Sequence, residues 1–304
     1  MRLILKNQFK QIITLWNYIK FKNVGAEFKR GLVMIEIKTC SKGAELISLK
    51  YNGEEKLHDG VNFWNRHSPI LFPIVGQIKN NKTIIEGKEY SMTQHGFARD
   101  MKFEEIKENY YILRNNEETL KKYPYKFELH VWYETKENCL IVNYKVINKD
   151  DKKIYFGLGA HPAFKCDYSN SQYSIEFESK EDNIEILQLE NGLISNKKIE
   201  TKEIIKDNKI KLKIDTFEND AIIMKNIKSN TVYLKNKEKT ELAFEFTGFP
   251  YLAIWSKTGS DFVCIEPWFN TADNIDSNGY FAQKENIINL KENEEFKCCY
   301  KIIF

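Results

Sequence analysis

Histidine, proline and cysteine are scarce in this sequence, and no two cysteines are spaced as a CxxC pair. The 304 residues include five histidines, six prolines and six cysteines. Without a CxxC pair, a zinc site built on cysteines is not expected. A chain of this length needs no disulfide framework to fold. We therefore expect reduced thiols in a cytoplasmic protein.

Long apolar runs and blocks of one charge are also absent. No run approaches the ~18 apolar residues of a transmembrane helix. The 46 basic and 43 acidic residues leave a net charge of +3, and they are spread along the chain. We therefore expect neither a membrane nor a nucleic acid as a partner.

The first 33 residues differ from the rest of the chain. They are basic and partly apolar, and polar residues interrupt any signal-peptide core. Apolar residues at helical spacings are compatible with an amphipathic helix. Alternatively, residues 1–33 are a translated leader or dispensable extension, because strand-like order begins at Met34, itself a potential start. N-terminal sequencing of the native protein distinguishes these alternatives.

From Met34 onward the hydrophobic period is mostly two, which is typical of β-strands. Apolar and polar residues alternate in 127–134, 173–178 and 242–246. Further segments are rich in β-branched and aromatic residues and predict strands covered on both faces: 139–148, 221–224, 231–234, 251–256, 262–268 and 296–304. Residues 84–90 predict a hairpin that turns near Gly87.

Many short strands without alternating helices predict an all-β fold, a large antiparallel β-sandwich. No Pro/Ser-rich linker divides the chain after Met34. We therefore expect residues 34–304 to form a single domain.

Two of the histidines lie where chemistry is expected. His95 in QHGFARD (94–100) and His161 in GLGAHPAF (157–164) stand at irregular places beside small residues. Glycine permits close approach of the backbone, and Pro162 fixes the chain direction after His161. A positioned imidazole near neutral pKa can donate or accept a proton.

A carboxylate interrupts an apolar segment in CIEPW (264–268). Glu266 is either paired, held with a raised pKa suited to a general base, or at a strand end facing water. Arg66 and Arg99 add cationic forks suited to hydroxyls or anions. Trp255 and Trp268 are suited to stacking on a sugar or to packing in a core.

Four stretches together carry a resemblance to a known family. They are RHSPILFPIVG (66–76), QHGFARD (94–100), GAHPAF (159–164) and CIEPWFNTAD (264–273). In this order and at these separations they resemble the aldose 1-epimerase (galactose mutarotase) family, and most of all its LacX-like branch. HGFAR is also similar to the hexose-6-phosphate mutarotase branch. The resemblance extends over residues 34–304 and implies a galactose mutarotase-like supersandwich.

The resemblance implies an isomerase that interconverts the α and β anomers of an aldohexose without a cofactor or a metal. By similarity, Glu266 takes the proton from the anomeric hydroxyl, and His161 protonates the ring oxygen. The ring opens to an aldehyde, rotates about C1–C2 and closes with the opposite configuration. A carboxylate and an imidazole tuned towards neutrality can perform these steps unaided.

The same resemblance assigns residues to substrate binding. His95 is expected beside the ring oxygen and Arg66 at sugar hydroxyls, with further contacts from Arg99, Asp220 and Trp268. One position departs from the family pattern, since Asn270 stands where many relatives have glycine. Asn tolerates left-handed backbone, so the turn is expected to survive.

Alternative functions remain compatible with the sequence. One is a hexose-6-phosphate mutarotase, because arginines of this region help to bind phosphate in that branch. Another is a non-catalytic carbohydrate-binding or sensor protein on the same fold, which would need neither His161 nor Glu266. A glycosidase would need a second catalytic carboxylate, for which Asp220 is the candidate. The partner in each case is a small sugar, and the protein is expected to be a monomer or homodimer.

Overall fold

The computed structural model describes residues 34–304, so the predictions for residues 1–33 lie outside the described residues. Met34–Phe304 form one compact unit. Within the two large sheets of this unit, every pair of neighbouring strands is antiparallel. This confirms the predicted all-β antiparallel fold.

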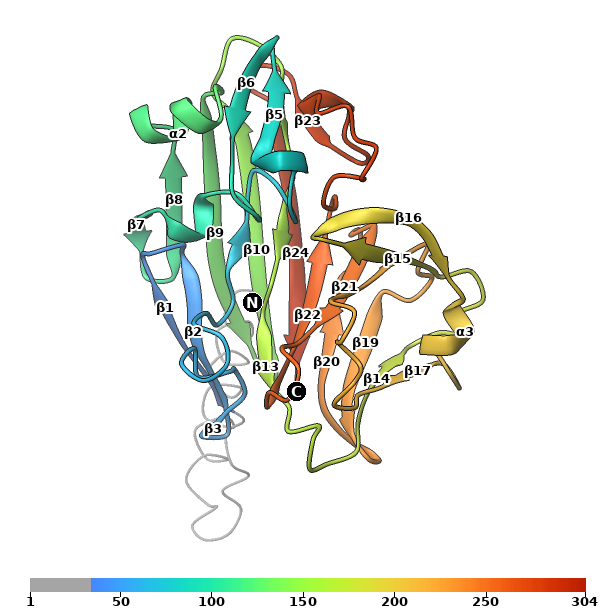
Figure 1. The fold of residues 1–304 in the computed structure, drawn as a ribbon. Helices are drawn as coiled ribbons and strands as arrows, with labels where there is room; N and C mark the ends of the chain where they lie inside the picture. The colour runs from blue at the N-terminus through green and yellow to red at the C-terminus, as the bar shows by residue number, and fades with distance from the viewer. Residues whose placement is uncertain (1–33) are drawn as a thin grey trace, which may run out of the picture. The chain divides into compact units, whose positions relative to one another are not determined.

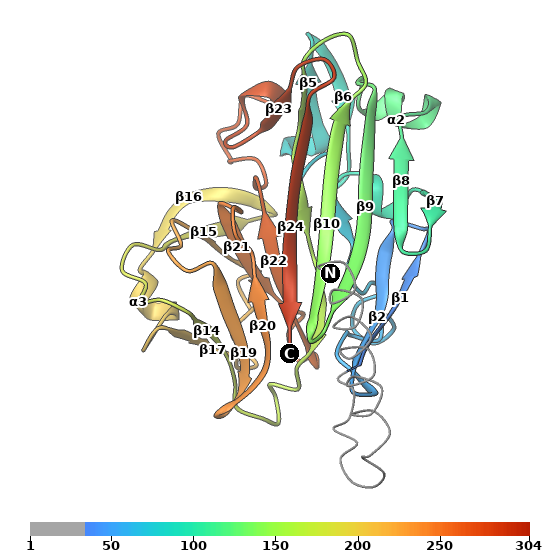
Figure 2. The same cartoon turned by 180° about the vertical axis from the view of Figure 1, so that it is seen from behind.

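The first large sheet contains nine strands (Figures 1 and 2). In spatial order these are β17 (Lys209–Lys211), β14 (Tyr173–Phe177), β19 (Thr231–Asn236), β20 (Lys239–Glu245), β24 (Glu295–Ile303), β10 (Cys139–Asn148), β9 (Phe127–Lys136), β8 (Tyr110–Arg114) and β7 (Glu104–Lys107). The long strands β24, β10 and β9 run side by side in both views.

The second large sheet carries most of the candidate site. Its order is β16 (Leu193–Ile199), β15 (Glu185–Glu190), β18 (Ile222–Lys225), β21 (Tyr251–Trp255), β22 (Phe262–Trp268), β12 (Gly159–Ala160) and β4 (Ile70–Leu71), while β13 (Ala163–Lys165) also pairs with β22. The chain therefore brings β12 next to β22 and β4 next to β12, although the three strands are far apart in sequence.

Smaller elements complete the described unit. The strands are β1 (Ile35–Cys40), β2 (Glu45–Tyr51) and β3 (Glu54–Glu55) in one sheet, β5 (Lys82–Ile85) with β6 (Lys88–Ser91), and β11 (Ile154–Phe156) with β23 (Ile288–Leu290). The helices are short: α2 (Glu117–Lys122), α3 (Thr201–Ile204) and the 3-10 turns η1 (Lys79–Asn81), η2 (Ala98–Asp100) and η3 (Phe281–Gln283). Among the described residues, no helix has both the length and the apolar character to cross a membrane.

The predicted hairpin is present, because β5 and β6 pair through a turn at Glu86 and Gly87, both with positive φ. The prediction that 139–148, 231–234 and 296–304 are covered on both faces is wrong. In β10 every second residue is only partly buried, and β24 has a similar alternation. The nine-stranded sheet therefore turns one face to the core and leaves the other partly open to solvent.

Strand β22 is buried along its whole length, and its two faces contact different surroundings. Val263 and Ile265 join the main hydrophobic core. Because side chains alternate across a strand, Cys264, Glu266 and Trp268 lie on the opposite face, where they join smaller clusters or line a cavity. This alternation presents a carboxylate to the outer side of the second sheet.

Candidate active site

A cavity of about 490 Å³ lies over the second sheet, between the strand ends and the loops that follow them. It is lined by six of the seven predicted site residues: His95, Arg99, His161, Asp220, Glu266 and Trp268. The seventh, Arg66, is not part of the lining, and its Nη2 lies 3.0 Å from Oδ1 of Asp100. The structure thus gathers side chains that are up to 173 residues apart in the sequence, counting from His95 to Trp268.

The centre of the cavity is a contact between His161 and Glu266. Nε2 of His161 lies 3.2 Å from Oε2 of Glu266, and the residues are 6% and 1% exposed. Nδ1 of His161 and both carboxyl oxygens of Glu266 are buried and have no hydrogen-bond partner of good geometry. Unpartnered polar atoms at this depth are uncommon in folded proteins and indicate a place for a ligand.

Strand pairing positions both side chains. Glu266 lies on β22 opposite Ala253 of β21. His161 follows β12, whose Gly159 pairs with Trp268 of β22. A Cβ at Gly159 would lie only 2.8 Å from Cδ1 of Trp268, so only glycine lets β12 approach this closely.

Burial shifts the pKa values of both groups towards their neutral forms. It raises the pKa of the Glu266 carboxyl well above its usual 4.5, an effect opposed by the nearby indole N–H of Trp268 and increased by the charge of Asp220. Burial also lowers the pKa of His161 to about 3, helped by the positive charges of Arg99 and Arg66. Burial therefore favours a pair that holds one proton, on the carboxyl of Glu266 rather than on the imidazole of His161.

His95 is held in a single tautomer beside this pair. Its φ of 67° is in the left-handed region, and its Nδ1 accepts a hydrogen bond of 3.1 Å from the backbone N–H of Gly76. Burial lowers the pKa of His95 well below its usual range, so the ring is neutral with its proton on Nε2. Its ring lies 5.5 Å from that of His161. His95 is thus a fixed hydrogen-bond donor.

Arg99 supplies the cationic wall of the cavity. Its Nη2 donates to the carbonyl oxygen of Gln94 at 2.7 Å, while its buried Nε has no hydrogen-bond partner and lies 3.9 Å from Oδ2 of Asp100. Burial and the charge of Arg66 lower the pKa of Arg99 to about 10, so the guanidinium is still charged at neutral pH. Lys257 also lines the cavity.

Three tryptophans surround the acid–base pair. Trp64 stacks on the His161 ring at 4.8 Å, and Trp255 meets it edge-on at 5.6 Å. Trp268 lies beneath, 6.3 Å from the ring of His95. Sequence reasoning overlooked Trp64, although it stands two residues before the motif that begins at Arg66. It also overlooked Lys257.

Two further positions considered in the sequence are Asp220 and Asn270. Asp220 is exposed at the rim, with φ of 73° and Oδ1 accepting from the backbone N–H of Ala221. The expectation of left-handed backbone at Asn270 is wrong, since its φ is not positive. Its buried side chain instead occupies the space that a Cβ of Gly157 would need.

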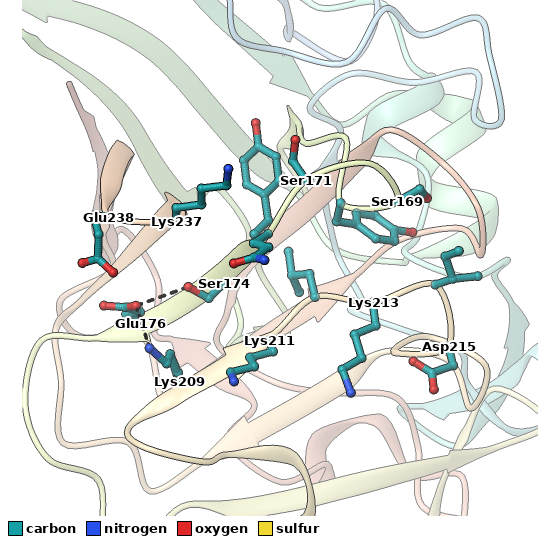
Figure 3. Close-up of a pocket in the computed structure, with 15 residues that line it drawn as sticks. Ser169, Ser171, Ser174, Glu176, Lys209, Lys211, Lys213, Asp215, Lys237 and Glu238 are labelled. Atoms are coloured by element: carbon teal, nitrogen blue, oxygen red, sulfur yellow. Dashed lines mark hydrogen bonds and ion pairs between the residues drawn. The ribbon is translucent and has the colours of Figure 1, made fainter.

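A second hollow of about 800 Å³ lies over β14 and β17 (Figure 3). Its lysines are either exposed, as Lys211 and Lys213 are, or near Glu176, as Lys209 is at 3.5 Å. It contains no buried acid–base pair. This hollow therefore offers no counterpart to the pair of His161 and Glu266.

Solved structures with similar folds place this sandwich in a class. A galactose mutarotase related enzyme from Lactobacillus acidophilus superposes with a TM-score of 0.81 at 31% identity, covering 89% of this chain and 94% of that one. A galactose mutarotase-like protein from Lactobacillus casei superposes with a TM-score of 0.80 at 28% identity, covering 88% and 96%. The fold is the galactose mutarotase-like β-sandwich.

Sequence comparison gives the family. The sequence model of the family described as aldose 1-epimerase matches residues 34–285. Protein LacX of Lactococcus lactis, in its plasmid form, is 30% identical in an alignment 298 residues long, which covers 91% of this chain and 98% of that protein. The chain belongs to the aldose 1-epimerase family, and LacX is among its relatives.

Proposed function

We propose that the protein is a mutarotase that interconverts the α and β anomers of an aldohexose, with Glu266 as the base and His161 as the acid. The observation that supports this most is the buried contact of 3.2 Å between Nε2 of His161 and Oε2 of Glu266, facing a cavity. We further propose that the reaction needs no cofactor and takes place in the cytoplasm, where all six free cysteines would remain reduced.

The closeness of the two groups suits the geometry of a hemiacetal. The anomeric hydroxyl oxygen O1 and the ring oxygen O5 are bonded to the same carbon, C1. An acid and a base that act on them must therefore lie close together, each within hydrogen-bond reach of its oxygen. The carboxyl and imidazole meet this requirement.

The proton count is the same before and after each step. Ring opening begins with Glu266 ionised and His161 protonated. The carboxylate accepts the O1 proton and His161 gives its proton to O5, while C1=O1 forms and C1–O5 breaks. This leaves neutral Glu266 and neutral His161, which is the state that burial favours in the free protein. Rotation about C1–C2 and the reverse transfers close the ring in the other configuration.

Neighbouring side chains are suited to holding the sugar. The Nε2–H of His95 is fixed as a donor by the bond at Nδ1, and we assign it to the ring-oxygen side. Trp268 offers an apolar surface, and Asp220 an acceptor at the rim. Arg66 would need to leave Asp100 to contact a hydroxyl.

Relaxation of freshly dissolved sugars tests this function. We expect the protein to accelerate the approach of α-glucose or α-galactose to anomeric equilibrium, followed by polarimetry or NMR exchange. A protein that binds these sugars without any acceleration would instead be a non-catalytic carbohydrate-binding protein.

Arg99 and Lys257 favour a second candidate, a hexose-6-phosphate mutarotase. Both line the cavity, and the buried Nε of Arg99 has no hydrogen-bond partner, with Oδ2 of Asp100 3.9 Å away. Charge-assisted bonds from a guanidinium suit a phosphate.

This second candidate predicts a selective effect of Arg99→Gln. The variant should raise the KM for glucose 6-phosphate about tenfold more than the KM for glucose, since about 1.4 kcal/mol corresponds to a factor of ten. Arg114→Gln is the matched control, because Arg114 lies on β8 and pairs with Glu104 and Glu128 outside the cavity lining. If Arg99→Gln changed the KM equally for glucose 6-phosphate and glucose, the hexose-6-phosphate candidate would be refuted.

A further inference from the structure

We propose that His161, Cys264 and Glu266 form a three-ligand site for a soft divalent cation, represented by Zn²⁺, and that the bound cation inhibits the protein. The cation site stands on its own observations, whereas the inhibition rests on the proposed function.

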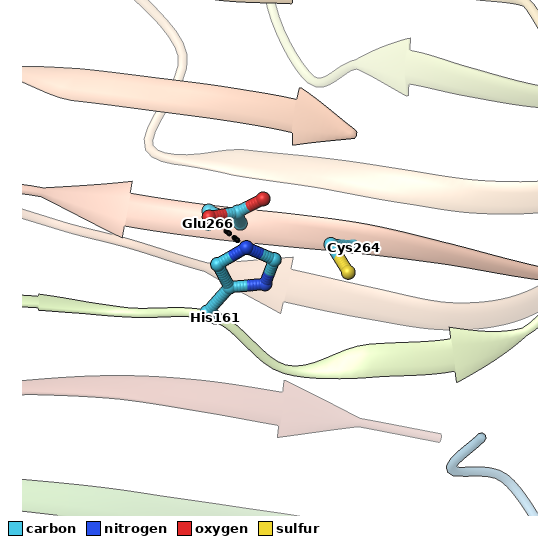
Figure 4. A group of neighbouring side chains, drawn as sticks. All are labelled: His161, Cys264 and Glu266. Atoms are coloured by element: carbon cyan, nitrogen blue, oxygen red, sulfur yellow. Dashed lines mark ion pairs between the residues drawn. The ribbon is translucent and has the colours of Figure 1, made fainter. Parts of the chain in front are cut away.

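The geometry of the three side chains is the first observation. One ligand atom from each residue lies within 4.8 Å of the other two. Cys264 and Glu266 are two residues apart on β22 and extend from the same face of the strand, with the His161 ring beside both (Figure 4). In a tetrahedral zinc site, bond lengths of about 2.0–2.3 Å place ligand atoms roughly 3.5 Å apart. The 3.2 Å contact of His161 with Glu266 already fits, and the thiol needs only a small shift.

The second observation is that the carboxyl oxygens are free. Both oxygens of Glu266 are buried and lack hydrogen-bond partners, and Nε2 of His161 faces one of them. All three residues are buried, and the thiol lies in a small cluster under Trp64 and Trp255. His161 and Glu266 line the cavity, which gives an ion a route to the site.

The charges also balance. A thiolate and a carboxylate together neutralise a divalent cation, and a neutral imidazole completes the set. Binding releases two protons, one from the thiol of Cys264 and one from the carboxyl of Glu266. A net neutral complex is the form that a buried site tolerates best. The soft sulfur ligand favours Zn²⁺ over Mg²⁺ or Ca²⁺.

Occupation of the site would stop proton transfer. The cation would use the same lone pairs of His161 and Glu266 that the proposed reaction uses, and both residues line the cavity. Zn²⁺ should therefore compete with the sugar. Affinity should increase with pH, because protons are released on binding.

The test combines metal binding with activity in the full-length protein. Titration with Co²⁺ should give one equivalent of a tetrahedral spectrum with a thiolate charge-transfer band. Zn²⁺ should displace the Co²⁺ and inhibit mutarotation. In Cys264→Ser the band should disappear, and inhibition should need about 100-fold more Zn²⁺, while activity without metal is unchanged. Cys299→Ser, which alters a thiol of β24, is the matched control and should behave as the wild type.

The outcomes separate this inference from the proposed function. Absence of the thiolate band, or wild-type Zn²⁺ affinity in Cys264→Ser, would overturn the cation site. A band that depends on Cys264 in a protein that converts no sugar would support the site and refute the mutarotase.

Discussion

Glu266→Gln is expected to lower the mutarotation rate by at least about 100-fold and, above about pH 5, to raise the melting temperature. Glutamine keeps the size of the side chain but cannot accept the O1 proton. The substitution also removes the ionisable carboxyl of Glu266, a residue that is 1% exposed and whose carboxyl oxygens lack hydrogen-bond partners. Loss of activity together with gain of stability is the pattern of a residue retained for function.

The sign of the stability change follows from the pKa of Glu266. In the unfolded chain the carboxyl loses its proton near pH 4.5, whereas in the folded protein burial raises the pKa well above that value. Between the two pKa values the unfolded state binds fewer protons, so stability falls as pH rises. The cost is about 1.4 kcal/mol for each pH unit in this window. The advantage of the Gln variant should therefore be absent below about pH 4 and grow with pH.

Melting curves at several pH values, together with polarimetry, check this expectation. Glu108→Gln is the matched control, because Glu108 is exposed in the turn between β7 and β8. It should change neither rate nor the pH dependence of melting. A Glu266→Gln protein with wild-type activity would remove Glu266 from the role of base.

The fold was predictable where the pattern is local. Alternation in 127–134 indicated β9, and the β-branched run 262–268 corresponds to the fully buried β22. Strand order was not predictable, because pairing such as that of Gly159 with Trp268 joins segments 109 residues apart. How far each face of a strand is buried also depends on segments that are distant in the sequence. This is why 139–148 was wrongly assigned two covered faces.

The candidate site was predictable mainly through the family resemblance. The motifs named Glu266, His161 and His95, and the structure brings these side chains to one cavity. Their catalytic and binding roles remain predictions. The position of Cys264 on the same face as Glu266 could have been predicted from the sequence, because residues two apart on a strand share a face. Trp64 was not, since its position depends on stacking against His161 across the fold.

His161→Asn is expected to reduce kcat by at least about 100-fold with little change in KM, because the lost group acts in the transition state. Asparagine retains a polar side chain but cannot carry the proton to O5. His130→Gln is the matched control, because His130 is a buried histidine on β9 that contacts Tyr110 and Glu128 outside the cavity. It should leave kcat unchanged. A His161→Asn protein with kcat near the wild-type value would exclude His161 as the acid.

The pH dependence of the wild-type rate follows from the single proton of the pair. The pair gains a second proton only near the pKa of His161, about 3. It loses its only proton as pH rises through the raised pKa of Glu266. The rate should therefore be level across the intermediate range and fall at both ends, with apparent pKa values that belong to the coupled pair. In His161→Asn this profile should be lost along with the rate.

The gain in stability of His161→Asn should depend on pH in the opposite sense from that of Glu266→Gln. His161 binds a proton near pH 6.5 in the unfolded chain but only near pH 3 when folded. Between these values the unfolded state binds more protons, so the wild type becomes less stable as pH falls. The Asn variant lacks this penalty and should gain melting temperature relative to the wild type on the acid side. If both variants instead showed the same pH dependence of melting, the two groups would not be held neutral by burial, and the single-proton pair would be wrong.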